Sequence, residues 1–150
     1  MKGGFKVSLK ANERIFINGA VVRVDRKTSL EFLNDVDFLL ENHVLQASDA
    51  TTPLKQLYYI VQIIVMAPNN ADNARDLFRV SIAALLETFE NSQITAELKN
   101  VDRLVNEKRI FEALKTIRSL FPIEDEILVA DKPVPPVSSE NPRELRAAAG

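Results

Sequence analysis

The chain has 150 residues, 46% of them apolar and 27% charged, so it can bury the core of one globular domain without a metal or a disulfide. The absence of cysteine excludes disulfides, thiolate zinc sites and cysteine nucleophiles, and a single histidine leaves little for a histidine-based metal site. No apolar run approaches the roughly 18 residues that a membrane-spanning helix needs, and no basic and apolar leader opens the chain. Composition therefore predicts a soluble, cytoplasmic protein with no catalytic role, no cofactor and no metal.

The net charge of −2 conceals an uneven distribution along the chain. Residues 1–27 carry seven lysines and arginines against two acids, a net charge of +5, whereas residues 28–98 carry three against ten, a net charge of −7. A basic N-terminal segment on a weakly acidic chain is typical of a surface that faces a polyanion. Exposed strands also carry basic residues to remain soluble and to block edge pairing, so the charge pattern alone leaves both interpretations open.

The first third of the chain has the pattern of β-strands. Apolar and polar residues alternate strictly over 5–10, which predicts a strand with one buried and one solvated face. The pair Asn18-Gly19 between two β-branched runs indicates a hairpin with a type I′ turn. Alternation continues over 30–32 and 36–40. We therefore expect residues 1–48 to form a basic, β-rich segment, arranged as an antiparallel meander of about five short strands.

The pattern changes to that of helices after residue 48. Thr52 followed by Pro53 is an N-cap with proline at the first helical position. The run 54–66 behind this cap is apolar nearly all round, which favours a helix central to the core or to an oligomer interface. The candidate residues for an interface with a partner or a second copy are Leu57, Tyr58, Ile60, Val61 and Ile64.

Three further helices follow, and the helical segment over 49–130 is predicted to pack with the β-rich segment over 1–48 as one domain. The first runs from Asp72 to Phe89, and the second is capped by Thr95. The last begins at Ile110 and is expected to end at Pro122. The predicted inner face of the first consists of Leu77, Phe78, Val80, Ile82, Leu85, Leu86 and Phe89.

The end of the chain differs from the helical part before it. The segment from Asn106 to Ile127 resembles the second half of a tetratricopeptide-type helical hairpin, but no 34-residue period supports a repeat array. From 131 to 150 the chain is proline-rich and then charged, and we expect a disordered tail. The predicted fold class is therefore α+β.

The residues that could support catalysis or metal binding are few. Four glycines, none in a glycine-rich loop, exclude the common nucleotide-binding loops. His43 with Glu41 nearby could form an acid–base pair, although a partly exposed turn residue is the simpler interpretation. Asp35, Asp37 and Glu41 could hold a hard cation, but without a glycine-centred ligand loop a solvated strand face is the better interpretation.

The remaining candidate is a nucleic-acid interface on the strands. Basic side chains on a β surface with an occasional aromatic ring suit single-stranded RNA, because they pair with phosphate while rings stack on bases. Phe5 and Phe16 are interleaved with the basic residues, but both also fall where core residues would fall. The candidate RNA-binding residues are Lys6, Lys10, Arg14, Arg23, Arg26 and Lys27.

Three sequence blocks are more specific than these patterns, namely 15–27, 38–45 and 50–59. In this order and spacing they closely resemble the flagellin-synthesis regulator family FlbT of alphaproteobacteria, and the resemblance extends from about Val7 to Leu128. The chain departs from the family at Asn12, where glycine is expected, but asparagine tolerates the left-handed conformation.

The resemblance implies a post-transcriptional regulator of flagellin. It implies binding to the 5′ untranslated region of flagellin messenger RNA, repression of translation and promotion of decay, with a functional link to the small flagellar protein FlaF. The alternative is a factor whose helical hairpin binds flagellin or another protein without touching RNA. A homo-oligomer suits both hypotheses, because duplicated binding surfaces add avidity.

Overall fold

The structure, a computed structural model, describes residues 5–131. The predicted tail lies outside these residues except for Asp131, which ends the last helix. The strands are β1 (Phe5–Leu9), β2 (Arg14–Ile17), β3 (Ala20–Arg23), β4 (Thr28–Phe32) and β5 (Phe38–Leu40). The helices are α1 (Pro53–Met66), α2 (Ala71–Thr88), α3 (Ser92–Asn106) and α4 (Ile110–Asp131), and short 3₁₀ turns are η1 (Glu41–His43), η2 (Ala47–Asp49) and η3 (Pro68–Asn70). The predicted α+β class is confirmed.

The strands form two small antiparallel sheets rather than one meander. β1 pairs with β4, and β2 pairs with both β3 and β5. The β2–β3 hairpin is confirmed, with positive φ at Asn18 (48°) and Gly19 (89°), and Asn12 adopts the left-handed conformation at 68°. The predicted meander is wrong because β1 pairs with β4 instead of with its neighbour in the chain, β2. Alternation along one strand does not reveal such a long-range pairing.

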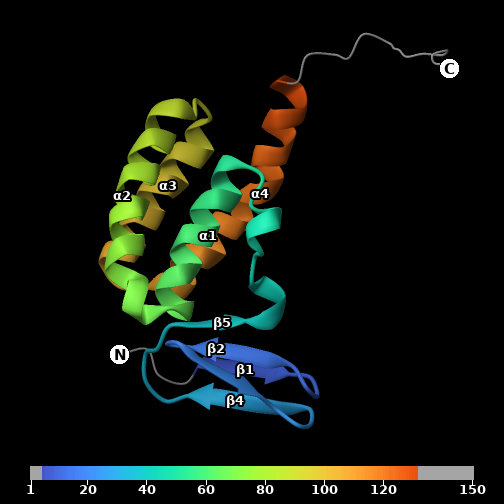
Figure 1. Ribbon diagram of the computed structural model, residues 1–150. Coiled ribbons are helices and arrows are strands. Elements are labelled where there is room, and N and C mark those ends of the chain that lie inside the picture. Colours follow the sequence, from blue (N-terminus) through green and yellow to red (C-terminus); the bar gives the residue numbers. More distant parts are fainter. Residues whose placement is uncertain (1–4, 132–150) are drawn as a thin grey trace, which may run out of the picture.

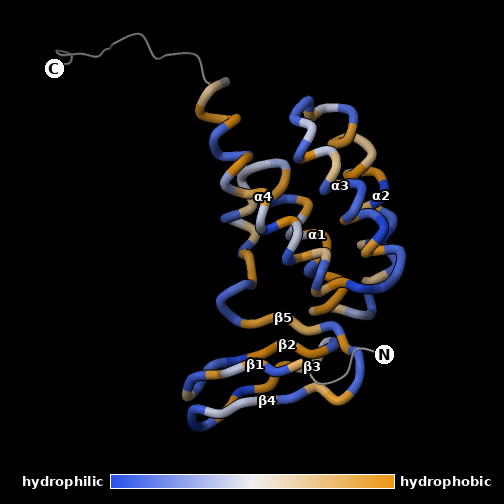
Figure 2. The backbone as a smooth tube through the Cα atoms, turned by 180° about the vertical axis from the view of Figure 1, so that it is seen from behind, coloured by the Kyte–Doolittle hydropathy of each residue, from blue (hydrophilic) through white to orange (hydrophobic). Residues whose placement is uncertain are grey.

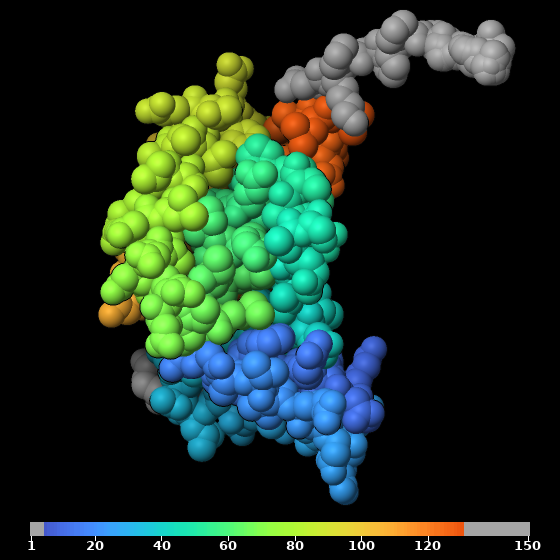
Figure 3. Space-filling view, viewed as in Figure 1, coloured from blue at the N-terminus to red at the C-terminus, as the bar shows by residue number. Residues whose placement is uncertain are grey.

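The sheets and helices are stacked in layers (Figure 1). The strand β2 lies in the middle layer, and its side chains alternate between two cores. Ile15 packs with Val7 and Leu9 of the outer β1–β4 ribbon, whereas Phe16 and Leu39 pack against the helices. The hydrophobic colouring of β5 and much of β2 in Figure 2 agrees with this position between the two cores. In space-filling view the strands occupy one end of the molecule and the helices the rest (Figure 3).

Helix α1 is the centre of the helical part and packs against both α2 and α4. The predicted cap is confirmed, since the Thr52 side chain accepts a hydrogen bond from the Lys55 N–H. Of the five candidate interface residues on this helix, four are covered within the same chain by neighbouring helices and strands. The buried residues are Leu57, Tyr58, Val61 and Ile64, and only Ile60 keeps partial exposure.

Helix α2 buries a narrower face than its apolar residues predict. Ala74, Phe78 and Ile82 recur every four residues and enter the core. Leu77 and Val80 were expected on this inner face, but their side chains are 52% and 70% exposed. The prediction is wrong for these two residues because, at 3.6 residues per turn, they project from a different side of the helix than the buried Ala74, Phe78 and Ile82.

Helix α4 continues through Pro122 instead of ending there. Two residues later the carboxylate of Glu124, which is fully buried, accepts hydrogen bonds from the Thr52 hydroxyl and from the Leu54 N–H at 2.8 Å. Tertiary contacts with the start of α1 therefore hold the segment after the proline, which overrides the local helix-breaking tendency. None of the helices within residues 5–131 is long and apolar enough to cross a membrane.

Candidate nucleic-acid interface

Five of the six candidate RNA-binding residues lie at one end of the β layers. The register pairs Leu9 with Thr28 and Arg14 with Arg23, and the Asn12 N–H donates to the carbonyl of Val24 at 2.7 Å. The loops after β1 and after β3 are therefore side by side. This basic end consists of Lys10, Arg14, Arg23, Arg26 and Lys27, all of them exposed.

The five cations of the basic end are not equally available to a phosphate, because two of them form ion pairs. The Arg14 guanidinium donates to the Glu41 carboxylate at 3.1 Å, and the Arg14 backbone N–H donates to the same group at 2.8 Å. These bonds from the Arg14 N–H and side chain lower the pKa of Glu41, so it remains ionised and offsets the arginine. Arg26 lies 3.4 Å from Asp25, with both side chains strongly exposed. Such an exposed pair contributes little and can exchange for phosphate.

The other three cations at the basic end have no ion pair with any residue in the described part of the chain. They are Lys10 and Lys27, on two neighbouring loops, and Arg23, at the end of β3. Each presents a separate donor to solvent. A polyanion with regularly spaced phosphates could therefore contact several of them at once.

Lys6 does not belong to the basic end. It lies in the middle of β1 on the solvent face of the outer ribbon, with Glu31 directly opposite on β4. The nearby ring of Phe5 is half-exposed but already contacts Phe38 and Phe111, at centroid distances of 5.5 and 5.4 Å. The structure therefore separates Lys6 from the other five cations and gives Phe5 a packing role.

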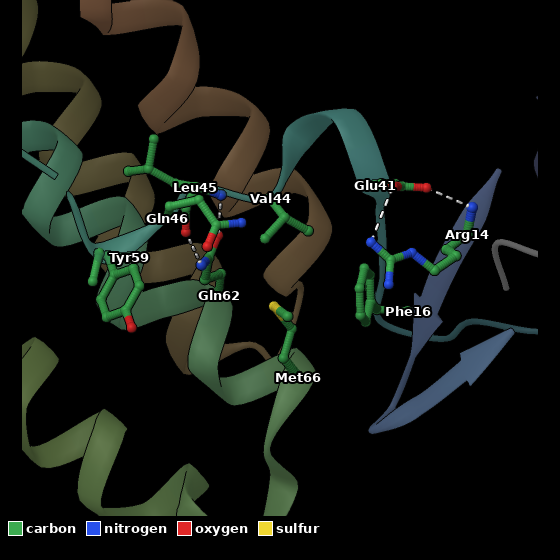
Figure 4. A pocket seen from close by; sticks show the side chains of 10 residues that line it. Arg14, Phe16, Glu41, Val44, Leu45, Gln46, Tyr59, Gln62 and Met66 are labelled. Atoms are coloured by element: carbon green, nitrogen blue, oxygen red, sulfur yellow. Dashed lines mark hydrogen bonds and ion pairs between the residues drawn. The ribbon is translucent and has the colours of Figure 1, made fainter. Parts of the chain in front are cut away.

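Phe16, in contrast, borders a shallow pocket of about 420 Å³ (Figure 4). The pocket lies between α1 and the three-stranded sheet of β3, β2 and β5, which is the middle sheet of the molecule. Tyr59, Gln62 and Met66 contribute the α1 wall, since a spacing of three and four residues places them on one helix face. Arg14 and Glu41 stand at the strand side of the opening. The remaining lining residues are Val44, Leu45, Gln46 and Ala47.

The loop wall of this pocket is held in place by Gln62. Its side-chain amide donates to the carbonyl of Leu45 at 2.6 Å and accepts from the Leu45 N–H at 3.0 Å. One buried side chain thus fixes the loop over 44–47 as a paired strand would. These two bonds of Gln62, together with the Arg14–Glu41 pair, hold the walls of the pocket in place without a ligand.

The other polar candidates have structural roles. Asp37 is half-buried rather than solvated, and its carboxylate accepts from the Ile110 N–H at 3.2 Å at the start of α4, while desolvation raises its pKa. The carbonyl of His43 accepts from the Tyr58 hydroxyl at 2.8 Å, and burial lowers the pKa of the imidazole. Asp37 and Glu41 thus bind different groups. No three acidic or histidine side chains within residues 5–131 are grouped as metal ligands.

The sequence pattern does not single out the pocket residues of α1, because the run 54–66 is apolar nearly all round. The available signal was Gln62, a polar residue inside that run, with Tyr59 three residues before it and Met66 four residues after it. This spacing marks one helix face that differs from the others.

The fold and these surfaces define a small α+β protein that presents a basic end and an adjoining mixed polar and aromatic pocket. The family described as flagellar protein FlbT matches residues 5–128, so the chain belongs to this family. A relative from Chelativorans sp. strain BNC1 is 59% identical over 88% of this chain and 91% of its own length.

Other relatives extend the similarity to nearly the whole chain. One from Rhizobium johnstonii is 57% identical and one from Agrobacterium fabrum is 51% identical, each over 97% of both chains. All three relatives are called probable flagellum biosynthesis repressor protein FlbT. No solved structure matches the chain.

Proposed function

We propose that this protein is a non-enzymatic, cytoplasmic repressor of flagellum biosynthesis that binds the 5′ untranslated region of flagellin messenger RNA. The name shared by its relatives supports regulation of flagellum synthesis. The observation that supports RNA as the target is the basic end, where five exposed cations from two adjacent loops and the neighbouring ends of β2 and β3 come together.

The proposed mechanism is occlusion of the transcript leader. Cations of the basic end bind successive phosphates of a single strand, and the bound protein blocks ribosome loading. Because an untranslated transcript is open to nucleases, the same binding event promotes its decay. The helical part over 53–131 carries nine lysines and arginines against twelve acids, a net charge of −3. This weak excess of acid favours RNA binding at the β layers over binding at the helices.

A salt titration with a double variant tests the phosphate contacts. Lys10 and Lys27 flank the last β1–β4 pair and form no ion pair in the described structure. Replacing both with alanine should flatten the dependence of log affinity on log salt by about 1.4, since each phosphate contact with a single strand contributes roughly 0.7. Affinity for a flagellin leader RNA and a scrambled RNA of equal length is measured by fluorescence anisotropy at several salt concentrations.

The matched control replaces two exposed lysines of the helical half, Lys99 and Lys115, with alanine. This variant has the same net charge as the test variant but retains the basic end, so its salt slope should equal that of the unaltered protein. An equal slope for both variants, or no binding of either RNA by the unaltered protein, would contradict the proposal.

A second candidate function is protein binding by the helical half, with flagellin or FlaF as the partner and no direct RNA contact. The exposed side chains of Leu77 and Val80, on the solvent face of α2, favour it. A pull-down with flagellin that depends on these two residues, together with no RNA binding, would support this candidate over the first. A homo-oligomer remains compatible with both.

A further inference from the structure

The pocket between the middle sheet and α1 lies beside the basic end, and the strand register connects the two. Arg14 lines the pocket, and Arg23 is its direct partner across the β2–β3 pair. Opposite residues of an antiparallel pair project from the same face of the sheet, about 5 Å apart. Phe16 and Val21 lie on this face too, two residues further along each strand. A cation without an ion pair in the described structure, Arg23, therefore stands one strand away from the rim.

The lining of the pocket suits a flat, aromatic and polar ligand. Phe16 and Tyr59 provide rings on opposite walls, and Met66 provides a polarizable side chain between them (Figure 4). The Tyr59 hydroxyl and the Gln46 amide form no hydrogen bond with other residues of the described chain, so both are available to a ligand. A volume of about 420 Å³ falls within the range of small-molecule sites and accommodates a purine or a pyrimidine.

The pocket is also rigid on two sides, which favours binding. Gln62 fixes the loop over 44–47 through two hydrogen bonds with Leu45, and Arg14 fixes Glu41 through two more. A preformed site requires little ordering when the ligand enters, so less affinity is lost on binding.

We propose that this pocket receives one unstacked base of the bound single-stranded RNA, while Arg23 and the free donors of Arg14 hold the adjacent phosphate. Sequence-specific recognition of RNA relies on unpaired bases that are splayed out and stacked on rings or guanidinium planes. The cations of the basic end contact phosphates and carry no sequence information, so the pocket supplies the base contact that they lack. This inference rests on the proposed RNA-binding function.

The test compares two substitutions of Tyr59, a partly exposed residue of α1. Tyr59→Leu removes the ring but keeps apolar bulk, and it should weaken binding to the leader RNA about tenfold, as expected for the loss of one stacked base. Its salt slope should remain that of the unaltered protein, because no phosphate contact is lost. Tyr59→Phe keeps the ring and should bind the leader within about twofold of the unaltered protein. Circular dichroism confirms that both variants are folded.

The outcomes separate this inference from the proposed function. If the unaltered protein binds the leader with a steep salt dependence and Tyr59→Leu binds equally well, the pocket inference is wrong and the basic end remains. A flattened slope in Tyr59→Leu would also overturn it, because that result would indicate a lost phosphate contact. No RNA binding by the unaltered protein would overturn both.

Discussion

At Gly19 a single hydrogen in place of a side chain allows the β layers to approach the helical part closely. The residue has φ of 89°, and a Cβ atom there would lie 2.8 Å from the Cδ atom of Pro68 in η3. Gly19→Ala should lower the free energy of unfolding by about 1–2 kcal/mol from the left-handed backbone alone, and further if Pro68 cannot move. Urea unfolding followed by circular dichroism measures this change, with an unchanged m-value as the sign that only stability has shifted.

The neighbouring turn position provides the control for Gly19→Ala. Asn18 also has positive φ, at 48°, but a glycine there removes atoms and relieves strain. Asn18→Gly should therefore change the free energy of unfolding by less than about 0.5 kcal/mol. If Gly19→Ala unfolds at the same urea concentration as the unaltered protein, the close contact with Pro68 does not limit the packing of the hairpin.

Among the helices, the end of α4 depends on one buried carboxylate. Glu124 accepts from both the Thr52 hydroxyl and the Leu54 N–H, so it satisfies donors at the start of α1 that have no partner within that helix. Glu124→Ala should lower the free energy of unfolding by about 2–3 kcal/mol, because two buried donors lose their shared acceptor. Thermal and urea unfolding of the purified variant provide the measurement.

Glu126 provides the matched control for this element. It lies two residues further along α4 and is exposed, so Glu126→Ala removes the same charge without removing a buried contact. We expect it to change the free energy of unfolding by less than about 0.5 kcal/mol. Equal effects of the two substitutions would show that charge on α4, and not the capping of α1, accounts for the loss.

The same elements show which features the sequence could predict. Local signals were sufficient for the Asn18-Gly19 turn, for the Thr52 cap and for the order of strands before helices, because each depends on residues close in the chain. The pairing of β1 with β4 and the continuation of α4 through Pro122 depend on contacts between distant segments. A periodic pattern within one segment carries no information about such contacts.

The candidate site follows the same rule. The cations of the basic end could be predicted from composition, but their separation from Lys6 required the strand register. The pocket joins β2, the loop over 44–47 and α1, three segments whose proximity exists only in the folded chain. The apolar residues of α1 fit either the core or an interface with a partner, because sequence alone cannot distinguish the chain's own core from an interface between chains.

In the molecule as a whole, the β layers and the helices share their interior. Leu39 of β5 belongs to the helical core, and the ring of Phe38 stacks on that of Phe111 in α4 at a centroid distance of 4.4 Å. Asp37, the residue before β5, also accepts from the Ile110 N–H, so the segment that leads into this strand holds the start of α4. Each core thus includes residues from the other part, which favours one cooperative unit over two independent domains.

Cooperativity of this kind predicts that a substitution at the junction destabilises both parts equally. Phe111→Ala removes the ring that stacks on Phe38 and should lower the free energy of unfolding by about 2–3 kcal/mol, below the value for a fully buried phenylalanine because Phe111 is half-buried. In native-state hydrogen exchange, the slowest amides of β2 and of α1 should open with the same free energy in the unaltered protein, and both should fall by this amount in the variant. If the opening free energy falls for the β2 amides but not for the α1 amides, the helices fold without the sheets. The pocket between the middle sheet and α1 would then form only when two separable parts dock.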